Sequence, residues 1–285
     1  MTSNYATVNN IKLHYVEEST GELVILLHGF PEFWYGWRNQ IPVLSKNYRV
    51  VAPDMRGYNL SDKPQNVSDY KIEILAADIA ALIKNLGAGK AIVVGHDWGA
   101  AVAWAVASLH PEVVSKLGIL NVPHPAEMRK AFLSFNLSQI IKSYYIFLFQ
   151  IPFIPEWLLS KNLHDFFSKS FEKFKPAGRP SPITEADIAK YVEAFQRPGA
   201  LTGAINYYRA AIRNMNSFAP TGMLEMPVLM LWGEQDKALG KELTYGTKDY
   251  CKNLEIVYDP TSGHFIQHDN PQLVNEKLLK FFKAV

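Results

Sequence analysis

The stretch that decides the fold runs Ala91-Ile92-Val93-Val94-Gly95-His96-Asp97-Trp98-Gly99-Ala100, and an alanine-rich segment follows it to Leu109. The apolar run predicts a buried strand, and the alanine-rich segment predicts a helix. The Gly-x-Asp-x-Gly turn between them is the strand-turn-helix pattern of a nucleophile elbow, with aspartate where such turns usually hold serine. The sequence therefore indicates an α/β chain that presents a reactive carboxylate above a sheet.

Both glycines of this turn have a physical reason. Side chains at Gly95 and Gly99 would collide with neighbouring backbone in so sharp a turn, while Asp97 is pushed above the sheet. The following helix directs its amide end toward the carboxylate and favours the anion. A lone aspartate before a helix usually only caps it, but the flanking glycines favour a nucleophile. The sequence has no Gly-x-Ser-x-Gly, so a serine esterase mechanism has no candidate nucleophile.

Short apolar runs alternate with helical patterns between Leu13 and Val122, as in a mostly parallel sheet flanked by helices. The helical spacing over residues 72–86 ends at Gly87, where a C-terminal cap is expected. The clearest predicted strands are residues 23–27, 49–52, 91–94, 227–232 and 254–258, and a closing helix is predicted over residues 271–282. We therefore expect one α/β core domain formed by residues 1–122 and 221–285.

Residues 123–220 interrupt this alternation. They show no clear strand pattern and are rich in Phe, Tyr and Pro, so we expect an inserted helical cap. Its most lipophilic stretch is residues 140–154, where Lys142, Gln150 and nearby prolines argue against a transmembrane span. We expect this stretch to be buried or to line a cleft, and loose membrane contact for collecting lipophilic substrate stays open as an alternative.

The composition narrows the class of partner. The chain has 285 residues, 48% of them hydrophobic, and a net charge of +2 without runs of like charge. Nucleic acid and anionic membranes are therefore not indicated, and small neutral or apolar substrates fit better. Cys251 is the single cysteine, so neither an internal disulfide nor a cysteine zinc site is expected. With no secretory signal pattern at the N-terminus, we expect a cytoplasmic location. We also expect a monomer or a homodimer.

A second motif, Leu26-Leu27-His28-Gly29-Phe30-Pro31-Glu32, follows a predicted strand. A carboxylate that attacks saturated carbon forms an ester, and hydrolysis of this ester needs donors for the oxyanion. We expect these donors to be the backbone N-H groups of Phe30 and Trp98. Phe30, Pro31 and Trp98 are also expected to contact the substrate. A cis peptide before Pro31 would fix the Phe30 amide, and His28 is expected to anchor the loop.

The base and its partner are expected late in the chain. Tyr258-Asp259-Pro260-Thr261-Ser262-Gly263-His264-Phe265 places His264 after the last predicted strand, where it closes the order nucleophile, acid, histidine. Asp236, at the end of the preceding strand, is the predicted acid, and Glu234 is its alternative. The competing histidines are His110, His124 and His268.

Together these motifs resemble the soluble epoxide hydrolases of the α/β-hydrolase superfamily, and the likeness covers nearly the whole chain. It extends to residues 54–64, where the family usually has glycine at the position of Asn59, and to Asn121-Val122-Pro123-His124-Pro125. The resemblance implies that epoxides are hydrolysed to vicinal diols through an ester on Asp97. Water is the co-substrate, and neither a metal nor an organic cofactor is required.

The resemblance also implies two cap tyrosines that hold the epoxide oxygen and protonate it. By likeness they are Tyr145, with Tyr144 as its alternative, and Tyr208. The helical spacing supports Tyr208, because Ile205 and Tyr208 share one helical face while Tyr207 points elsewhere.

Two other functions remain. A haloalkane dehalogenase resembles this chain in its elbow and its ester, and Trp98 would suit a halide. Its second halide ligand is often an Asn or a cap Trp, and here residue 30 is Phe, although Trp157 keeps the option open. The other possibility is an inactive hydrolase fold that binds ligands, because fold does not guarantee activity. The complete set of Asp97, Asp236 and His264 argues against it.

Overall fold

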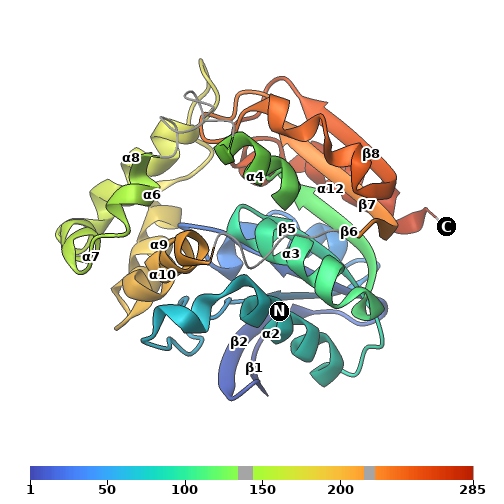
Figure 1. The fold of residues 1–285 in the computed structure, drawn as a ribbon, viewed down its shortest axis with the longest axis horizontal. Coiled ribbons are helices and arrows are strands. Elements are labelled where there is room, and N and C mark those ends of the chain that lie inside the picture. Colours follow the sequence, from blue (N-terminus) through green and yellow to red (C-terminus); the bar gives the residue numbers. More distant parts are fainter. Residues whose placement is uncertain (134–143, 215–221, 285) are drawn as a thin grey trace.

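The computed structural model describes residues 1–133, 144–214 and 222–284. Within these ranges one sheet has eight strands in the order β1-β2-β4-β3-β5-β6-β7-β8 (Figure 1). The β1/β2 and β2/β4 pairs are antiparallel, and the other pairs are parallel. The strands are β1 Thr2–Val8, β2 Ile11–Glu18, β3 Leu23–Leu27, β4 Arg49–Pro53, β5 Ala91–His96, β6 Val114–Leu120, β7 Leu224–Gly233 and β8 Cys251–Asp259. This is the predicted α/β-hydrolase architecture.

Helices cover both faces of the sheet, so alternate residues of the central strands are buried on opposite sides. Ile25 and Val93 lie in one apolar cluster with α2 and α3, whereas Val24 and Ile92 lie in another with α1 and α12. A strand buried on both faces reads as a continuous apolar run, which is how β3 and β5 could be predicted. The flanking helices are α1 Ile41–Leu44, α2 Ile72–Asn85, α3 Trp98–Leu109, α11 Ile266–Asp269 and α12 Pro271–Lys283.

The end of α2 follows the expected capping chemistry. Gly87 has a φ of 78°, in the left-handed region that favours glycine. Its N-H donates to the carbonyl of Lys84, and the N-H of Ala88 donates to that of Ile83. This geometry satisfies carbonyl groups that the end of the helix leaves unpaired. The predicted C-terminal cap is confirmed.

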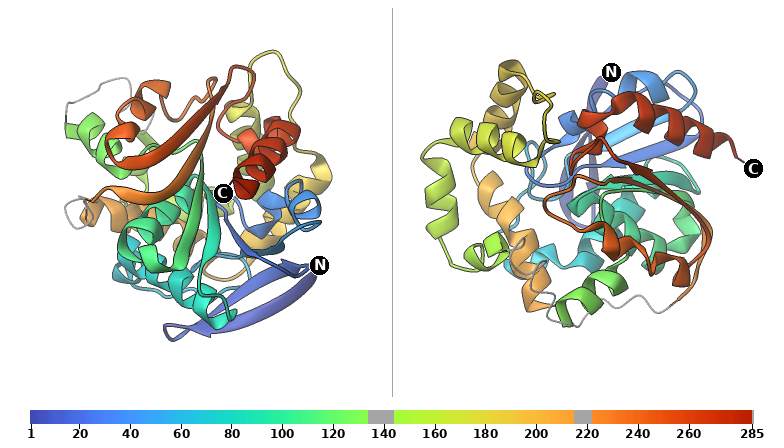
Figure 2. Two further views of the ribbon diagram at one scale, coloured as in Figure 1. Left: turned by 90° about the vertical axis from the view of Figure 1, so that its right-hand side faces the viewer. Right: turned by 90° about the horizontal axis from the view of Figure 1, so that it is seen from above.

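A helical insertion between β6 and β7 lies to one side of the sheet (Figures 1 and 2). A capping box starts α9, because Thr184 accepts from the Asp187 N-H while the Asp187 carboxylate accepts from the Thr184 N-H. The predicted limit at residue 220 lies outside the described residues. None of the described helices is both long and apolar enough to cross a membrane. The insertion contains α4 Pro125–Leu133, α6 Tyr144–Leu148, α7 Ile154–Ser160, α8 Leu163–Phe174, α9 Glu185–Gln196 and α10 Ala200–Arg213.

Candidate active site

The turn between β5 and α3 has the predicted sharp geometry. Asp97 has φ 50° and ψ −124°, an unusual conformation for a residue other than glycine. A Cβ atom at Gly95 would lie 2.3 Å from the carbonyl oxygen of Gly99, and one at Gly99 would lie 2.1 Å from that of Leu27. Both distances are far inside van der Waals contact. The two glycines therefore let the turn form against β3 and leave Asp97 at its apex.

The loop after β3 reaches the Asp97 carboxylate directly. The Phe30 N-H donates to Asp97 Oδ1 at 2.7 Å, and the Phe30-Pro31 peptide bond is cis, as expected. A Cβ atom at Gly29 would lie 2.3 Å from Asp97 Cβ, so only glycine permits this approach. Trp98 begins α3, but donation by its N-H to the same oxygen stays a prediction. Oδ1 of Asp97 is thus held by a backbone N-H, and Oδ2 is the oxygen that could react with a substrate.

His264 lies between two carboxylates. Its Nδ1 is 2.8 Å from Asp236 Oδ2, and its Nε2 is 3.4 Å from Asp97 Oδ2. All three residues follow strands of the parallel part of the sheet, whose carboxyl ends meet at one edge. Glu234, the alternative acid, instead pairs with Lys241. The structure therefore brings together Asp97, His264 and Asp236, the three residues selected from the sequence.

The competing histidines have other partners. His268 Nε2 lies 2.6 Å from Glu32 Oε1, and the buried ring of His124 stacks on Tyr250 at 4.2 Å between centroids. His110 Nδ1 lies 3.9 Å from Glu112 Oε1. Their surroundings give none of them the position between two carboxylates that His264 has.

The charges around His264 set its protonation. Burial lowers its pKa, but the carboxylates of Asp236 and Asp97 outweigh burial and raise the pKa to about 10. For Asp236, burial raises the pKa, yet His264, the Leu239 N-H and the Asn121 side chain reverse this and lower it. At neutral pH the ring is therefore an imidazolium held by an ionised partner.

Asn121 was not selected from the sequence as a functional residue. Its Nδ2 donates to Asp236 Oδ2 at 2.8 Å, and its Oδ1 accepts from the Gly233 N-H at 3.0 Å. It follows β6 with a φ of 52°, a conformation that asparagine tolerates better than most residues. The signal that could have found it is its place directly after a strand, like Asp97 and Asp236.

A buried polar cluster around Glu32 was also missed. Glu32 Oε1 lies 2.6 Å from His268 Nε2 and accepts from the Tyr191 hydroxyl of α9 at 3.0 Å. Glu32 Oε2 is 3.3 Å from His96 Nδ1, and His96 Nε2 is 2.8 Å from the carbonyl oxygen of His264. Burial raises the pKa of Glu32, but the two histidines lower it well below its usual range. The cluster ties the loop after β3, the elbow and the His264 loop to the insertion.

Two other residues from the predicted motifs have structural partners. Buried His28 accepts the Met55 N-H on Nε2 at 3.0 Å, consistent with its predicted anchoring role. Asn59 has a φ of 38°, the left-handed backbone that the family's glycine suggested. Its side chain donates to Asp54 at 2.8 Å and accepts from Arg197 Nε at 2.8 Å, so it links the core to the end of α9.

The two neighbouring tyrosines of α10 point in different directions. The ring centroid of Tyr208 lies 5.0 Å from that of Trp98 and 5.5 Å from that of Phe30, beside the elbow. The ring of Tyr207 lies 5.7 Å from that of Trp98, but its hydroxyl donates to the Arg56 carbonyl at 2.9 Å. This agrees with the predicted helical faces. Tyr145 belongs to α6, but its side chain lies outside the described part of the structure, so its role stays a prediction.

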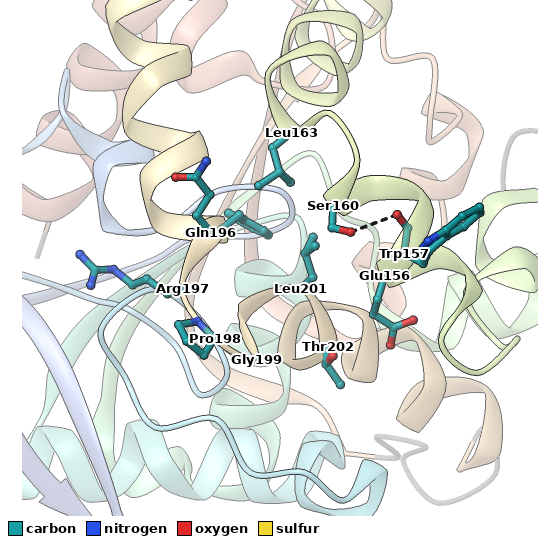
Figure 3. A pocket seen from close by; sticks show the side chains of 11 residues that line it. Glu156, Trp157, Ser160, Leu163, Gln196, Arg197, Pro198, Gly199, Leu201 and Thr202 are labelled. Carbon is teal, nitrogen blue, oxygen red and sulfur yellow. Dashed lines mark hydrogen bonds between the residues drawn. The ribbon is translucent and has the colours of Figure 1, made fainter.

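Trp157, the predicted alternative halide ligand, lies on the surface of the insertion. It is 57% exposed on α7, with Lys161 Nζ 3.3 Å from its ring centroid. It borders a cleft of about 470 Å³ between α7 and the α9–α10 turn, shown in Figure 3. Buried Phe195 also lines this cleft, and its ring lies 6.2 Å from that of Phe30. This exposure and the cation contact with Lys161 are what the structure shows of Trp157.

Comparison with known proteins identifies the family. A family model described as "alpha/beta hydrolase fold" matches residues 22–271. The chain belongs to the α/β-hydrolase family. This hydrolase is 42% identical to the AB hydrolase superfamily protein YfhM of Bacillus subtilis, over 98% of this chain and 97% of that protein. It is 38% identical to epoxide hydrolase 4 of Mus musculus, over 96% of this chain and 77% of that protein.

Solved structures place the α/β hydrolase close to the epoxide hydrolases. The Bacillus megaterium epoxide hydrolase, in complex with an inhibitor, superposes with a TM-score of 0.88 and 32% identity, covering 99% of this chain and all of that one. Epoxide hydrolase A of Mycobacterium thermoresistibile gives a TM-score of 0.89 and 30% identity, covering 99% and 98%. The predicted resemblance is confirmed, because the chain belongs to the α/β-hydrolase family and is related to epoxide hydrolases.

Proposed function

We propose that this α/β hydrolase converts epoxides to vicinal diols through an ester on Asp97. The observation that supports this most is the division of the Asp97 carboxylate between two partners. Oδ1 accepts the Phe30 N-H at 2.7 Å, and Oδ2 lies 3.4 Å from His264 Nε2. This division supports Oδ1 as the oxygen held in the oxyanion site and Oδ2 as the attacking oxygen.

In the first step Asp97 Oδ2 attacks an epoxide carbon and the ring C-O bond breaks. The oxygen leaves as an alkoxide that must take up a proton. Tyr208 supplies this proton, assisted by Tyr145 in the proposal. The product is a hydroxyalkyl ester of Asp97. Phe30, Pro31 and Trp98 surround the apolar part of the substrate.

In the second step water attacks the carbonyl carbon of the ester. Protonated His264 cannot act as a base, but ester formation removes the negative charge of Asp97. Because this carboxylate helps to raise the pKa of His264, its loss lowers that pKa. The ring then gives its proton back to the Tyr208 phenolate and is free to take a proton from water. The Phe30 and Trp98 amides hold the oxyanion, and its collapse breaks the bond to the alkyl oxygen, which leaves as the diol with the proton from His264. Asp97 then transfers its own proton to His264, which restores the carboxylate and the imidazolium.

The relatives support epoxides over haloalkanes as substrates. Proteins called epoxide hydrolases recur among both the curated relatives and the solved structures, and one Bacillus megaterium structure holds its diol product. The 57% exposure of Trp157 argues against its predicted role as a halide ligand in the cap.

The test is to trap the ester. In His264→Ala the first step proceeds and the second stops, so mass spectrometry after exposure to styrene oxide should find the added mass of one substrate on the Asp97 peptide. The double variant Asp97→Ala, His264→Ala is the matched control and should show no adduct. An unmodified Asp97 peptide in His264→Ala would refute the mechanism. Wild-type assays with styrene oxide and a bromoalkane separate the functions, because halide without diol would indicate a dehalogenase.

A further inference from the structure

Large apolar side chains gather on the outer side of the helical insertion. In the described parts of the chain, seven of the thirteen exposed large apolar residues fall within residues 147–158. This set, here called the apolar cap patch, comprises Phe147, Leu148, Ile151, Phe153, Ile154, Trp157 and Leu158. Figures 1 and 2 show this segment, at the end of α6 and along α7, at the edge of the molecule. Scattered exposed apolar residues are ordinary, but a contiguous group marks a surface that binds something.

The sequence led us to expect the lipophilic stretch over residues 140–154 to be buried or to line a cleft. That expectation is wrong for most of its described side chains. Phe149 is buried, but Phe147, Ile151 and Phe153 are exposed. The physical reason is that Phe149 packs on Tyr208 inside the insertion, whereas its apolar neighbours keep much of their surface in solvent.

Phe153 is the most exposed member of the patch. Its side chain is 83% exposed, and its backbone φ of 64° lies in the left-handed region that bulky residues avoid. Folding gains little from a strained residue whose ring stays in water. Strained residues cluster at functional sites, so the strain supports a role for this exposed ring.

The charges around the patch suit a lipid surface. Glu156 is the single charged residue between positions 144 and 160, and its carboxylate turns inward to buried Arg209, at 2.5 Å and 3.1 Å from Nη1 and Nη2. Figure 3 shows Glu156 directed toward α10, whereas Trp157 lies on the outer side of α7. Lys161 Nζ stands 3.3 Å from the Trp157 ring centroid at the edge of the patch. Apolar side chains beside an amphipathic Trp and a lysine are typical of interfacial membrane contact.

The patch is also continuous with the candidate active site. Ile146 and Leu159 come from the inner faces of α6 and α7, and they pack against the cluster of Phe149 and Tyr208. A thin apolar layer therefore separates the outer surface from Tyr208, the proposed proton donor. Substrate dissolved in a lipid phase would meet apolar side chains along this whole path.

We propose that the apolar cap patch docks this protein on the surface of a lipid bilayer, from which it takes lipophilic epoxides. The substrate class rests on the proposed epoxide hydrolase activity, whereas docking does not. A second copy of the chain fits the patch less well. A stable dimer buries about 800 Å² per partner across 20 to 30 residues, more than one protruding turn and helix provide. A bilayer needs no complementary shape.

Flotation with phosphatidylcholine vesicles, with and without phosphatidylglycerol, tests the docking. Wild-type protein should float with both, and Phe153→Gly should reduce the bound fraction about tenfold because one buried aromatic ring is lost. Glycine accepts the backbone at position 153, so the melting temperature should stay the same or rise. Leu158→Glu should also abolish flotation. Tyr245→Glu is the matched control, since Tyr245 is 61% exposed but lies after β7, and its binding should equal that of wild type.

Absence of wild-type flotation, or equal flotation of Phe153→Gly and wild type, would overturn the proposal. A wild-type dimer that Phe153→Gly dissociates, without vesicle binding, would make the patch an interface between copies and would also overturn the proposal.

The enzymatic activity is measured separately. Phe153→Gly should hydrolyse dissolved styrene oxide like wild type but should be slower on a long-chain alkene epoxide held in vesicles. Lack of diol from both substrates would refute the proposed function and leave the flotation result to decide docking.

Discussion

Asn121 donates its side-chain amide to Asp236 at 2.8 Å, to the same carboxylate oxygen that bonds His264. The link joins the end of β6 to the loop after β7 and gives this oxygen a second donor beside the imidazole. Asp236 also accepts the Ala238 and Leu239 N-H groups on its other oxygen, at 2.7 Å and 3.0 Å. The buried carboxylate thus has donors on both oxygens, which keeps it ionised and oriented.

Asn121→Ala should destabilise the fold and slow ester hydrolysis. The change leaves the Gly233 N-H without its buried acceptor and removes one donor from Asp236. We expect a loss of about 1–3 kcal/mol in the free energy of unfolding. Hydrolysis of the Asp97 ester should slow while its formation does not, which single-turnover kinetics measures. Slowing of both steps to the same degree would mean that Asn121 is only structural.

Asp236→Asn should leave the fold intact and block the second step. An amide can still hydrogen-bond the ring, but it cannot stabilise imidazolium. The comparable substitution in a serine protease triad costs about 10⁴ in kcat, and we expect a loss of about 10³ or more with accumulation of the ester. Glu234→Gln is the control and should stay within about twofold of wild type, because the Glu234 carboxylate pairs with Lys241. A strong effect of Glu234→Gln would reassign the acid.

Tyr208→Phe should affect the rate of ester formation, whereas Tyr207→Phe should affect the stability of the fold. The first removes a proposed acid, so ester formation should slow about 10²-fold. The second breaks the hydrogen bond to the Arg56 carbonyl, so stability should fall by about 1 kcal/mol while ester formation changes little. Rapid-quench kinetics and chemical denaturation on the two variants separate the effects. Equal rates in the two variants would remove Tyr208 from the mechanism.

The raised pKa of His264 makes stability depend on pH in one direction. Its folded pKa of about 10 lies above its ordinary value of 6.5, so its contribution is complete below about pH 6.5 and is lost as pH rises through 10. The free energy of unfolding of wild type should therefore fall between pH 7 and 10 more steeply than that of His264→Gln. Urea denaturation at several pH values gives the difference between the two proteins. Parallel curves would contradict the raised pKa.

Gly99→Ala should test the close contact of the elbow with β3. The new Cβ atom would lie 2.1 Å from the Leu27 carbonyl oxygen, so helix and strand must move apart. We expect a loss of about 3 kcal/mol, at the upper end for overpacked sites, together with loss of activity. Gly89→Ala is the control, because nothing lies within 4 Å of its added Cβ atom. Its stability should be unchanged or slightly higher.

Local motifs were sufficient to select most residues of the candidate site. Asp97, Phe30, Asp236 and His264 each follow a strand, so chain order and turn chemistry were enough to select them. Asn121 also follows a strand but was noted only as part of a family motif, and Glu32 was not selected because its partners are distant in sequence. His268 lies more than two hundred residues from Glu32 in the sequence, and no local sequence pattern predicts their contact.

Strands β1 and β6 were not among the clearest predicted strands, because their sequences lack a continuous apolar run. Alternating exposure in β1 and the lysine and glycine in β6 weaken their apolar patterns. The exposed face of residues 147–158 shows a different limit. Composition identifies apolar side chains but does not say which of them will find partners in the fold.

The path of the chain through the sheet sets the order in which the site can be assembled. β6 and β7 are hydrogen-bonded neighbours, yet the whole helical insertion lies between them in the chain. Closing so long a loop costs entropy, which slows this pairing during folding. Asp97 and Phe30 precede the insertion, whereas Asp236 and His264 follow it. A ribosome therefore releases the proposed nucleophile long before its proposed base, so an unfinished chain could not regenerate an alkylated Asp97.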